Sequence, residues 1–221
     1  ITKELFDGEL AWVPWQRPGF DLGLKLEQTL AENPGIRGIV LGGHGLFTWG
    51  DTAYDSYINT LNTIEKASAY LEANYGKTRP VFGGSRVENE SAERRTEIAA
   101  KLAPYLRGLA SDQQAMIGHF TDDARVLEFI ASADLDKLAP LGTSCPDHFL
   151  RTKIRPLVLD FPFEKLSLTD QEISEHIRPQ FEAYRESYQA YYDRCKRDNS
   201  PAVRDSNPVI ILLPGVGMFS F

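Results

Sequence analysis

The sequence predicts an α/β protein in which a mixed or largely antiparallel sheet is covered by helices. Short apolar runs that are typical of strands alternate along the chain with longer amphipathic patterns that are typical of helices. Glycine and proline residues mark the joins between these segments. A strand that ends in a glycine turn occurs twice, which indicates a second, degenerate copy of the same unit.

The composition excludes several classes of protein. The 221 residues can bury a substantial core, as one large domain or two small ones. A formal net charge of −7, without a run of Arg and Lys, argues against nucleic acid or an anionic membrane surface as a partner. Cys145 and Cys195 lie far apart, and no apolar run is long enough to span a membrane. We therefore expect a reduced, cytoplasmic protein.

The stretch from Gly38 to Gly50 organises the first part of the chain. It is typical of a buried strand, a glycine-flanked His44, a second short strand and a helix that begins near residue 51. Gly43 and Gly45 leave space for a ligand beside the histidine, which is good geometry for a metal ligand. The alternative is a tight turn in which the histidine hydrogen-bonds to the backbone.

Further elements precede and follow this stretch. Pro14 confines the first predicted strand to a sheet edge or a strand end. The long helix after Gly50 carries apolar residues at helical spacing, which we interpret as a packing face rather than a substrate wall. These residues are Tyr57, Ile58, Leu61, Ile64, Ser68 and Leu71. The predicted elements are a helical turn at 1–6, a strand at 11–15 and helices at 21–32 and 52–75.

A polar, glycine-containing connection at residues 77–90 separates this part from the rest. Beyond it, Pro104 is expected to kink or split a helix. Thr169 and Glu172 form a capping-box pattern at the start of a helix rich in Tyr and charge, which we interpret as a solvated outer helix. The predicted elements are helices at 91–109, 122–130 and 169–197, and strands at 115–120, 155–161 and 209–213.

An internal repeat relates the two strand–turn segments. When Gly43 is set against Gly215, at an offset of 172 residues (215 − 43), the apolar classes and glycines match. His44 then aligns with Val216, and valine cannot coordinate a metal. The alternative is that two unrelated buried strands each end in a glycine turn, which a superposition of the two segments would decide. The aligned segments are 39–41 with 211–213 and 43–49 with 215–221.

Together, the strand, the Gly-His-Gly turn, the Leu-Phe-Thr-Trp-Gly string and the helix resemble the third zinc-ligand segment of the class II aldolase/adducin family. Over nearly its whole length, the chain is more similar still to the aldolase part of bifunctional rhamnulose-1-phosphate aldolase/short-chain alcohol dehydrogenase proteins. The strings that carry this second resemblance are Ala11-Trp12-Val13-Pro14-Trp15-Gln16-Arg17-Pro18-Gly19-Phe20-Asp21, Gly118-His119-Phe120-Thr121-Asp122-Asp123 and Gly142-Thr143-Ser144-Cys145-Pro146-Asp147-His148-Phe149-Leu150-Arg151-Thr152-Lys153.

The resemblance implies a zinc-dependent aldolase that cleaves a ketose 1-phosphate, such as rhamnulose 1-phosphate, to dihydroxyacetone phosphate and an aldehyde. In the family, three histidines hold Zn²⁺, which polarises the ketone and stabilises the enediolate, while a carboxylate moves protons. Only His44 matches a zinc ligand of the family, because the His-x-His element and the carboxylate lie upstream of this segment there. We therefore expect Zn²⁺ to be completed by ligands from outside this sequence, and the catalytic residues stay unknown.

The resemblance also divides the chain. Residues 1–76 would form the C-terminal part of an aldolase-like unit, 77–90 a linker, and 91–221 a degenerate second unit that is truncated at its end. The chain begins at Ile1 without a methionine and stops inside an apolar run, so we interpret it as an internal fragment. Family members assemble as oligomers, so we expect a homo-oligomer. A non-catalytic, adducin-like scaffold or pseudo-enzyme stays open as the alternative.

The other histidines are weaker metal candidates. His119 follows a strand-end glycine and is more typical of a strand end than of a ligand, and His176 lies on a polar helix. Cys145 could join His148 as a soft metal pair, but nothing nearby in the sequence completes a tetrahedron. No G-x-G-x-x-G fingerprint precedes a helix, so NAD would bind only in a domain beyond this chain.

A polar turn with alternating cations is a weak candidate for a phosphate site. Hydroxyls, backbone donors and cations in one segment can cradle a phosphate. The same alternation of Arg and Lys is also typical of a solvated face. The candidate residues are Thr143, Ser144, Arg151 and Lys153.

Overall fold

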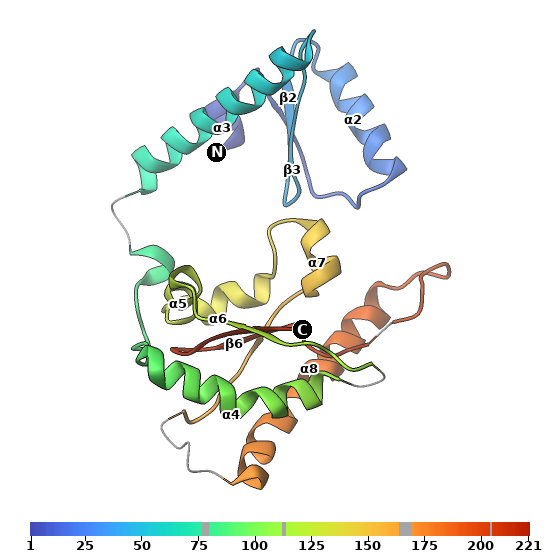
Figure 1. The fold of residues 1–221 in the computed structure, drawn as a ribbon. Coiled ribbons are helices and arrows are strands. Elements are labelled where there is room, and N and C mark those ends of the chain that lie inside the picture. The colour runs from blue at the N-terminus through green and yellow to red at the C-terminus, as the bar shows by residue number, and fades with distance from the viewer. Residues whose placement is uncertain (77–79, 112–113, 164–168, 204) are drawn as a thin grey trace. The chain divides into compact units, whose positions relative to one another are not determined.

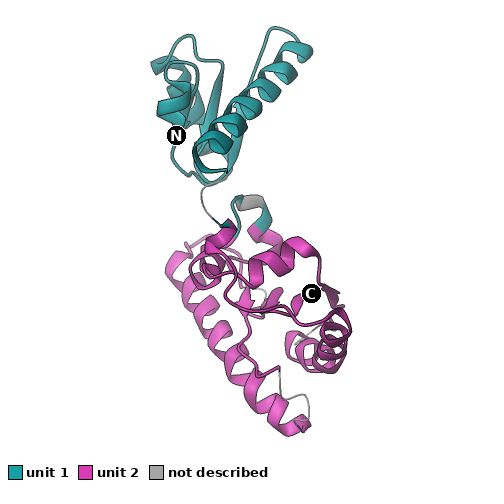
Figure 2. Cartoon of the chain, turned by 90° about the vertical axis from the view of Figure 1, so that its left-hand side faces the viewer, with its two compact units in different colours: residues 1–80, 143–148 teal, residues 81–142, 149–221 magenta. Residues whose placement is uncertain are grey.

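The computed structural model describes residues 1–221 apart from 77–79, 112–113, 164–168 and 204. The described chain divides into two compact units, coloured teal and magenta in Figure 2. The first unit comprises residues 1–80 and 143–148, and the second comprises 81–142 and 149–221. Each unit combines a mixed sheet with helices (Figure 1), which confirms the predicted fold class.

The first unit contains a three-stranded sheet in the order β1-β2-β3. β1 is parallel to β2, and β2 is antiparallel to β3, to which a tight turn joins it. Its strands are β1 (Ala11–Val13), β2 (Gly38–Leu41) and β3 (Gly45–Thr48). Its helices are α1 (Thr2–Phe6), α2 (Phe20–Glu32) and α3 (Ala53–Tyr75).

The helices α2 and α3 cover opposite faces of this sheet (Figure 1). Leu22 of α2 forms a buried cluster with Val13, Ile39 and Leu41, which point to one face because side chains alternate along a strand. On the other face, the Oγ1 of Thr48 in β3 lies 2.6 Å from the Oγ1 of a threonine in α3, Thr60. The described contact of the sheet with α2 is therefore apolar, whereas its contact with α3 includes a hydrogen-bonded pair of threonines.

The predicted packing face of α3 is wrong for the part of the chain that the structure describes. The helix meets the sheet through polar groups instead, such as Asn59, whose Nδ2 donates to the backbone O of Trp49 at 2.8 Å. Four of the apolar residues in the predicted face are between 42% and 61% exposed. They are Tyr57, Leu61, Ile64 and Leu71.

The second unit contains a four-stranded sheet in the order β4-β7-β6-β5. Only the β5–β6 pair is parallel. The strands are β4 (His119–Thr121), β5 (Leu157–Val158), β6 (Ile210–Leu213) and β7 (Gly217–Ser220). The helices are α4 (Ala92–Ala110), α5 (Ala124–Ile130), α6 (Leu135–Leu138) and α8 (Asp170–Cys195), with short 3₁₀ turns η1 (Val81–Gly83) and η2 (Ala139–Leu141). A further helix, α7 (Pro146–Thr152), contains residues of both units.

The sheet of the second unit has a core on each face. Ile211 and Leu213 of β6 pack with α4 and α8, whereas Leu212 between them packs with α5 and α6. The helix α8 contributes Ile173 and Phe181, among other residues, to the larger cluster, so the prediction of a solvated outer helix is wrong. Most of its charged residues are exposed, although Arg185 is partly buried, and its capping box forms as predicted.

Several predicted boundaries shift. β4 and β5 are shorter than the apolar runs that predicted them, with three and two residues in their ladders. The helix α4 continues through Pro104 and is not split. It buries Leu102 and Leu106 on either side of the proline, and this packing holds the two halves in one helix despite the lost backbone hydrogen bond. Among the described residues, no helix is long and apolar enough to cross a membrane.

Residues 81–90 hydrogen-bond with the rest of the second unit. The backbone N–H groups of Arg86 and Val87 donate to the carbonyl of Ala131 at 2.7 and 3.1 Å. The N–H of Glu90 donates to the carbonyl of Gly215 at 2.9 Å. The predicted boundaries at residues 76 and 91 stay a prediction, and residues 77–79 of the predicted linker lie outside the described residues.

Two glycine substitutions test the packing of the second unit. Gly142 has φ 71°, and a methyl group there would lie 1.9 Å from the backbone O of Ile154. We expect Gly142→Ala to lower the free energy of unfolding by about 1–3 kcal/mol from backbone strain alone, with the collision in addition. Gly108 of α4 is the matched control, because a methyl group there meets nothing within 4 Å.

Gly108→Ala should raise the free energy of unfolding by about 0.5–1 kcal/mol, because alanine loses less backbone entropy in a helix. The midpoint of urea denaturation measures both changes. Equal effects of the two substitutions would contradict the described turn at Gly142.

Candidate functional site

The candidate site is the turn that joins β2 to β3. The N–H of His44 donates to the carbonyl of Leu41 at 3.1 Å, which closes a four-residue turn. Gly43 has φ 62° at the third position, as a type II turn requires. The turn is tied to β1 by the N–H of Gly42, which donates to the carbonyl of Val13 at 2.8 Å. His44 is therefore fixed at the edge of the sheet by its backbone.

The imidazole of His44 carries an unsatisfied atom. Its Nδ1 is buried and has no hydrogen-bond partner among the described residues, although the residue as a whole is partly exposed. A buried polar atom without a partner costs free energy and is rare in folded proteins. A lone pair on a rigidly held imidazole is what a metal ligand offers. The alternative that the histidine hydrogen-bonds to the backbone does not apply to Nδ1.

The second unit repeats this turn at the same offset of 172 residues. Ile39 pairs with Phe47 in the first unit, and Ile211 pairs with Phe219 in the second. The N–H of Val216 donates to the carbonyl of Leu213 at 2.9 Å, and Gly215 has φ 77°. A parallel strand, β1 or β5, flanks each hairpin on the same side. Strand order and turn geometry therefore agree in the two units, as a repeat requires, while a duplication that gave a degenerate second unit stays a prediction.

The two turns differ in what surrounds them. Val216 is 0% exposed. A methyl group at Gly215 would lie 2.9 Å from the backbone O of Glu88 and 3.2 Å from Cγ1 of Val87, so residues 87–90 cover this turn. At Gly43 the nearest atom to such a methyl group is Cδ1 of Trp15 at 3.5 Å. The second turn is closed within its own unit, whereas the first is not covered in this way.

The described residues do not surround His44 with a set of metal ligands. Among them, no group of three or more His, Cys, Asp or Glu side chains could hold a metal ion. His119 is the exposed first residue of β4, opposite Ser220, and the ring of His176 lies against that of Phe161 at a centroid distance of 5.8 Å. The residues present therefore do not make a complete zinc site, and the assignment of His44 as a ligand stays a prediction.

The predicted phosphate residues are divided between the two units. Thr143 and Ser144 belong to the first unit, and the hydroxyl of Thr143 donates to the carbonyl of Cys145 at 3.0 Å. Arg151 and Lys153 belong to the second. The phosphate site therefore stays a prediction.

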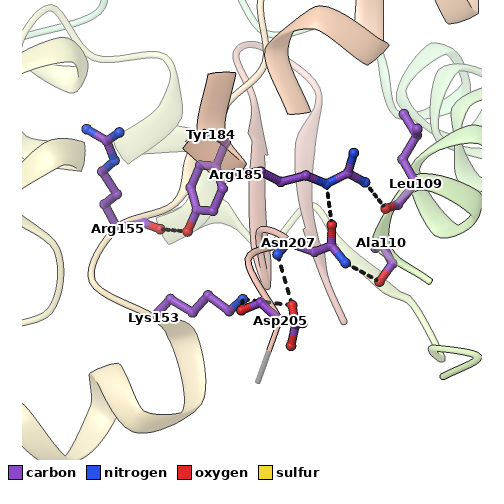
Figure 3. A network of polar contacts seen from close by, with 8 residues as sticks. All are labelled: Leu109, Ala110, Lys153, Arg155, Tyr184, Arg185, Asp205 and Asn207. Carbon is purple, nitrogen blue, oxygen red and sulfur yellow. Dashed lines mark hydrogen bonds and ion pairs between the residues drawn. The ribbon is translucent and has the colours of Figure 1, made fainter. Parts of the chain in front are cut away.

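Lys153 is held within the second unit (Figure 3). Its Nζ donates to Oδ1 of Asp205 at 2.8 Å, lies 4.6 Å from the ring centre of Tyr188, and leaves the side chain 10% exposed. Burial lowers the pKa of Lys153, and the hydrogen bond and charge of Asp205 act against this shift. Its backbone has φ 60°, an unusual conformation for a residue other than glycine. Lys153, which the sequence indicated as a cation for a phosphate site, is thus already paired with the carboxylate of Asp205.

Sequence analysis missed the polar network around Lys153 (Figure 3). Arg185 of α8 donates from Nε to Oδ1 of Asn207 at 2.6 Å and from Nη2 to the carbonyl of Leu109 at 2.8 Å. Tyr184 donates its hydroxyl to the carbonyl of Arg155 at 2.7 Å, and burial raises its pKa. These groups join the end of α4, α8 and the segment before β6, so their role is structural. The sequence pattern that could have indicated this network is the Asn207-Pro208 pair shortly before β6.

Comparison with known proteins decides the family. The family model described as "Class II Aldolase and Adducin N-terminal domain" matches residues 1–71, and the one described as "Aldolase class II, second domain" matches residues 97–221. The chain belongs to the class II aldolase/adducin family. Within this family, the closed second turn falls in the second domain and the His44 turn in the N-terminal domain.

A curated relative is similar to nearly the whole chain. The protein named "Uncharacterized oxidoreductase YuxG" from Bacillus subtilis (strain 168) is 33% identical over 218 residues. The match covers 99% of this chain and 31% of the relative, so the chain spans less than a third of the relative's length. No solved structure matches.

The equivalent positions 44 and 216 of the two aldolase-family units give a matched pair of substitutions. His44→Val removes an unpartnered polar atom, so we expect the free energy of unfolding to be unchanged or higher. Val216→His places an imidazole at a position that is 0% exposed, so we expect a loss of about 1–3 kcal/mol. Urea denaturation, followed by circular dichroism, measures both. A similar loss for both substitutions would contradict the described difference between the two turns.

Proposed function

We propose that the chain is part of a zinc-dependent class II aldolase that cleaves a ketose 1-phosphate, with rhamnulose 1-phosphate as the model substrate. The products are dihydroxyacetone phosphate and an aldehyde. The family supports an aldolase. The observation that carries the proposal is the Nδ1 of His44, which is buried without a partner on a rigid turn. The specific sugar and the metal belong to the proposal.

The reaction is a retro-aldol cleavage. A base removes the proton of the C4 hydroxyl, the C3–C4 bond breaks, and its electrons form the enediolate of dihydroxyacetone phosphate, which is then protonated. Zinc, when bound, supplies the Lewis acidity that polarises the ketone and stabilises this enediolate. His44 would contribute one nitrogen ligand, held in place by the turn hydrogen bond from its own N–H to Leu41. No described residue is assigned the role of base.

The remaining ligands would come from polypeptide outside this sequence. Three protein ligands are usual for a catalytic zinc site, and the described residues contain no group of three that could serve. A relative whose length is only 31% covered by this chain has room for them. The name of that relative, an oxidoreductase, supports the further proposal that the whole protein joins the aldolase to a short-chain dehydrogenase that binds NAD outside this sequence.

We also propose that the protein is cytoplasmic and self-associates. The net charge of −7 and the two distant cysteines support a reduced compartment and no nucleic-acid or membrane partner. Exposed aromatic residues of α3, among them Tyr54 at 70% and Tyr57 at 61%, support a contact with another subunit.

A non-catalytic scaffold is the second candidate. The observation that favours it is the closed second turn. There Val216 occupies the position that is equivalent to His44, and residues 87–90 cover the backbone. One of the two units therefore has no open ligand position at its turn. If the first unit is also without metal, the family's adducin-like role in assembly fits better than catalysis.

Zinc content decides between the two candidates. In the complete protein we expect about one zinc per chain, lost in His44→Ala because one of three ligands is removed. His119→Ala is the matched control, since His119 is an exposed strand residue, and it should keep its zinc. Inductively coupled plasma mass spectrometry measures the metal.

Release of dihydroxyacetone phosphate from rhamnulose 1-phosphate measures the activity. We expect His44→Ala to lower kcat/KM by about 100-fold or more, because even residues that only orient a metal ligand are worth 10–100-fold. Absence of zinc from the wild-type protein would support the scaffold. Full zinc and activity in His44→Ala would exclude His44 as a ligand.

A further inference from the structure

Two of the three tryptophans lie beside the turn that carries His44. Trp12 is the middle residue of β1, and Trp15 follows two residues after this strand ends. Because β1 and β2 are parallel, both strands end at the same edge of the sheet. The hydrogen bond from Gly42 to the carbonyl of Val13 at 2.8 Å holds the segment after β1 against the turn.

The indole rings lie close to the turn. A methyl group at Gly42 would lie 3.0 Å from Cζ2 of Trp12 and 3.3 Å from the backbone N of Trp15. A methyl group at Gly43 would lie 3.5 Å from Cδ1 of Trp15. Glycine at position 42 therefore lets the indole of Trp12 approach the segment that carries His44, whereas the indole of Trp15 lies at an ordinary contact distance from a methyl group at Gly43.

Both indole side chains are exposed to solvent in the described chain. Trp12 is 50% exposed and Trp15 is 55% exposed. The third tryptophan, Trp49, is partly buried and packs on the core cluster of the first unit. Large aromatic side chains are normally most buried, and an exposed apolar surface beside a few placed polar groups marks a binding site. Here the polar group is the unpartnered Nδ1 of His44.

The internal repeat provides a comparison. Trp12 pairs with Val40, and Val158 pairs with the equivalent Leu212, so Trp15 corresponds to Phe161. Phe161 is 6% exposed and belongs to the core of the second unit. The aromatic residue is thus buried in the unit whose turn carries Val216, and open in the unit whose turn carries a histidine.

We propose that Trp12 and Trp15 form an aromatic wall that binds the aldehyde-derived half of the sugar phosphate at His44. This rests on the aldolase proposal above. An indole has no positive charge, so these two side chains would not bind the phosphate group, which would lie elsewhere. The aldehyde half of a deoxysugar ends in C–H and methyl groups, which pack on an indole face, while the indole N–H can donate to a hydroxyl.

The kinetic test uses the complete protein in the direction of aldol addition. In Trp12→Ala and Trp15→Ala we expect KM for lactaldehyde to rise about 10-fold or more, by the loss of apolar contact, with KM for dihydroxyacetone phosphate unchanged. Trp15→Phe should restore most of the affinity, because a flat apolar face remains. Trp49→Phe is the matched control and should leave both KM values unchanged. An equal rise in both KM values would overturn the wall as a determinant of the aldehyde half.

A binding measurement separates failure of the wall from failure of the aldolase proposal. The complete protein is labelled with 5-fluorotryptophan, and the fluorine resonances are assigned with Trp→Phe variants. Addition of rhamnulose 1-phosphate should shift the resonances of Trp12 and Trp15 and leave that of Trp49. These shifts would support the wall even in a protein without turnover.

No shift at Trp12 or Trp15 overturns the proposal, whether or not the protein is active. Fluorine resonances that are also insensitive to a soluble paramagnetic probe would show that other parts of the protein cover the indoles. In that case the two tryptophans are packing residues.

Discussion

The structure depends on one backbone constraint, a glycine in the left-handed region at the third position of a four-residue turn. Gly43 has φ 62° and Gly215 has φ 77°. In each turn the N–H of the fourth residue donates to the carbonyl of the first, which sets the register of the hairpin. The fourth residue, His44 or Val216, is thereby fixed in place by main-chain atoms alone.

The residues that surround this turn differ between the two units. In the second unit, two hydrophobic clusters cover the sheet, and residues 87–90 lie over the turn. In the first unit, one small cluster lies under α2, and a polar contact between Thr48 and Thr60 lies under α3. The unit with the larger core has a valine at the fourth residue of the turn. The unit with the smaller core has a histidine with a buried, unpartnered nitrogen.

Local patterns predicted the elements well, and contacts between distant residues less so. The capping box at Thr169 and the strand before each glycine turn follow from spacing within a short window, and the likeness of the two turns follows from comparing two such windows. The helical spacing of Tyr57 and Leu61 placed them on one face, but it could not say whether any part of the chain covers that face. Likewise, Lys153 has its carboxylate partner 52 residues away, at Asp205, and no local pattern links the two.

The repeated turn accepts different side chains at its fourth residue. Because main-chain atoms alone define the turn, exchange of an imidazole for an isopropyl group at its fourth residue leaves the hairpin intact. The side chain is not the whole difference, however, since residues 87–90 cover the turn of the second unit. Opening a ligand position at this turn would require changes in two separate segments, at Val216 and in residues 87–90, so a single substitution would not convert one turn into the other.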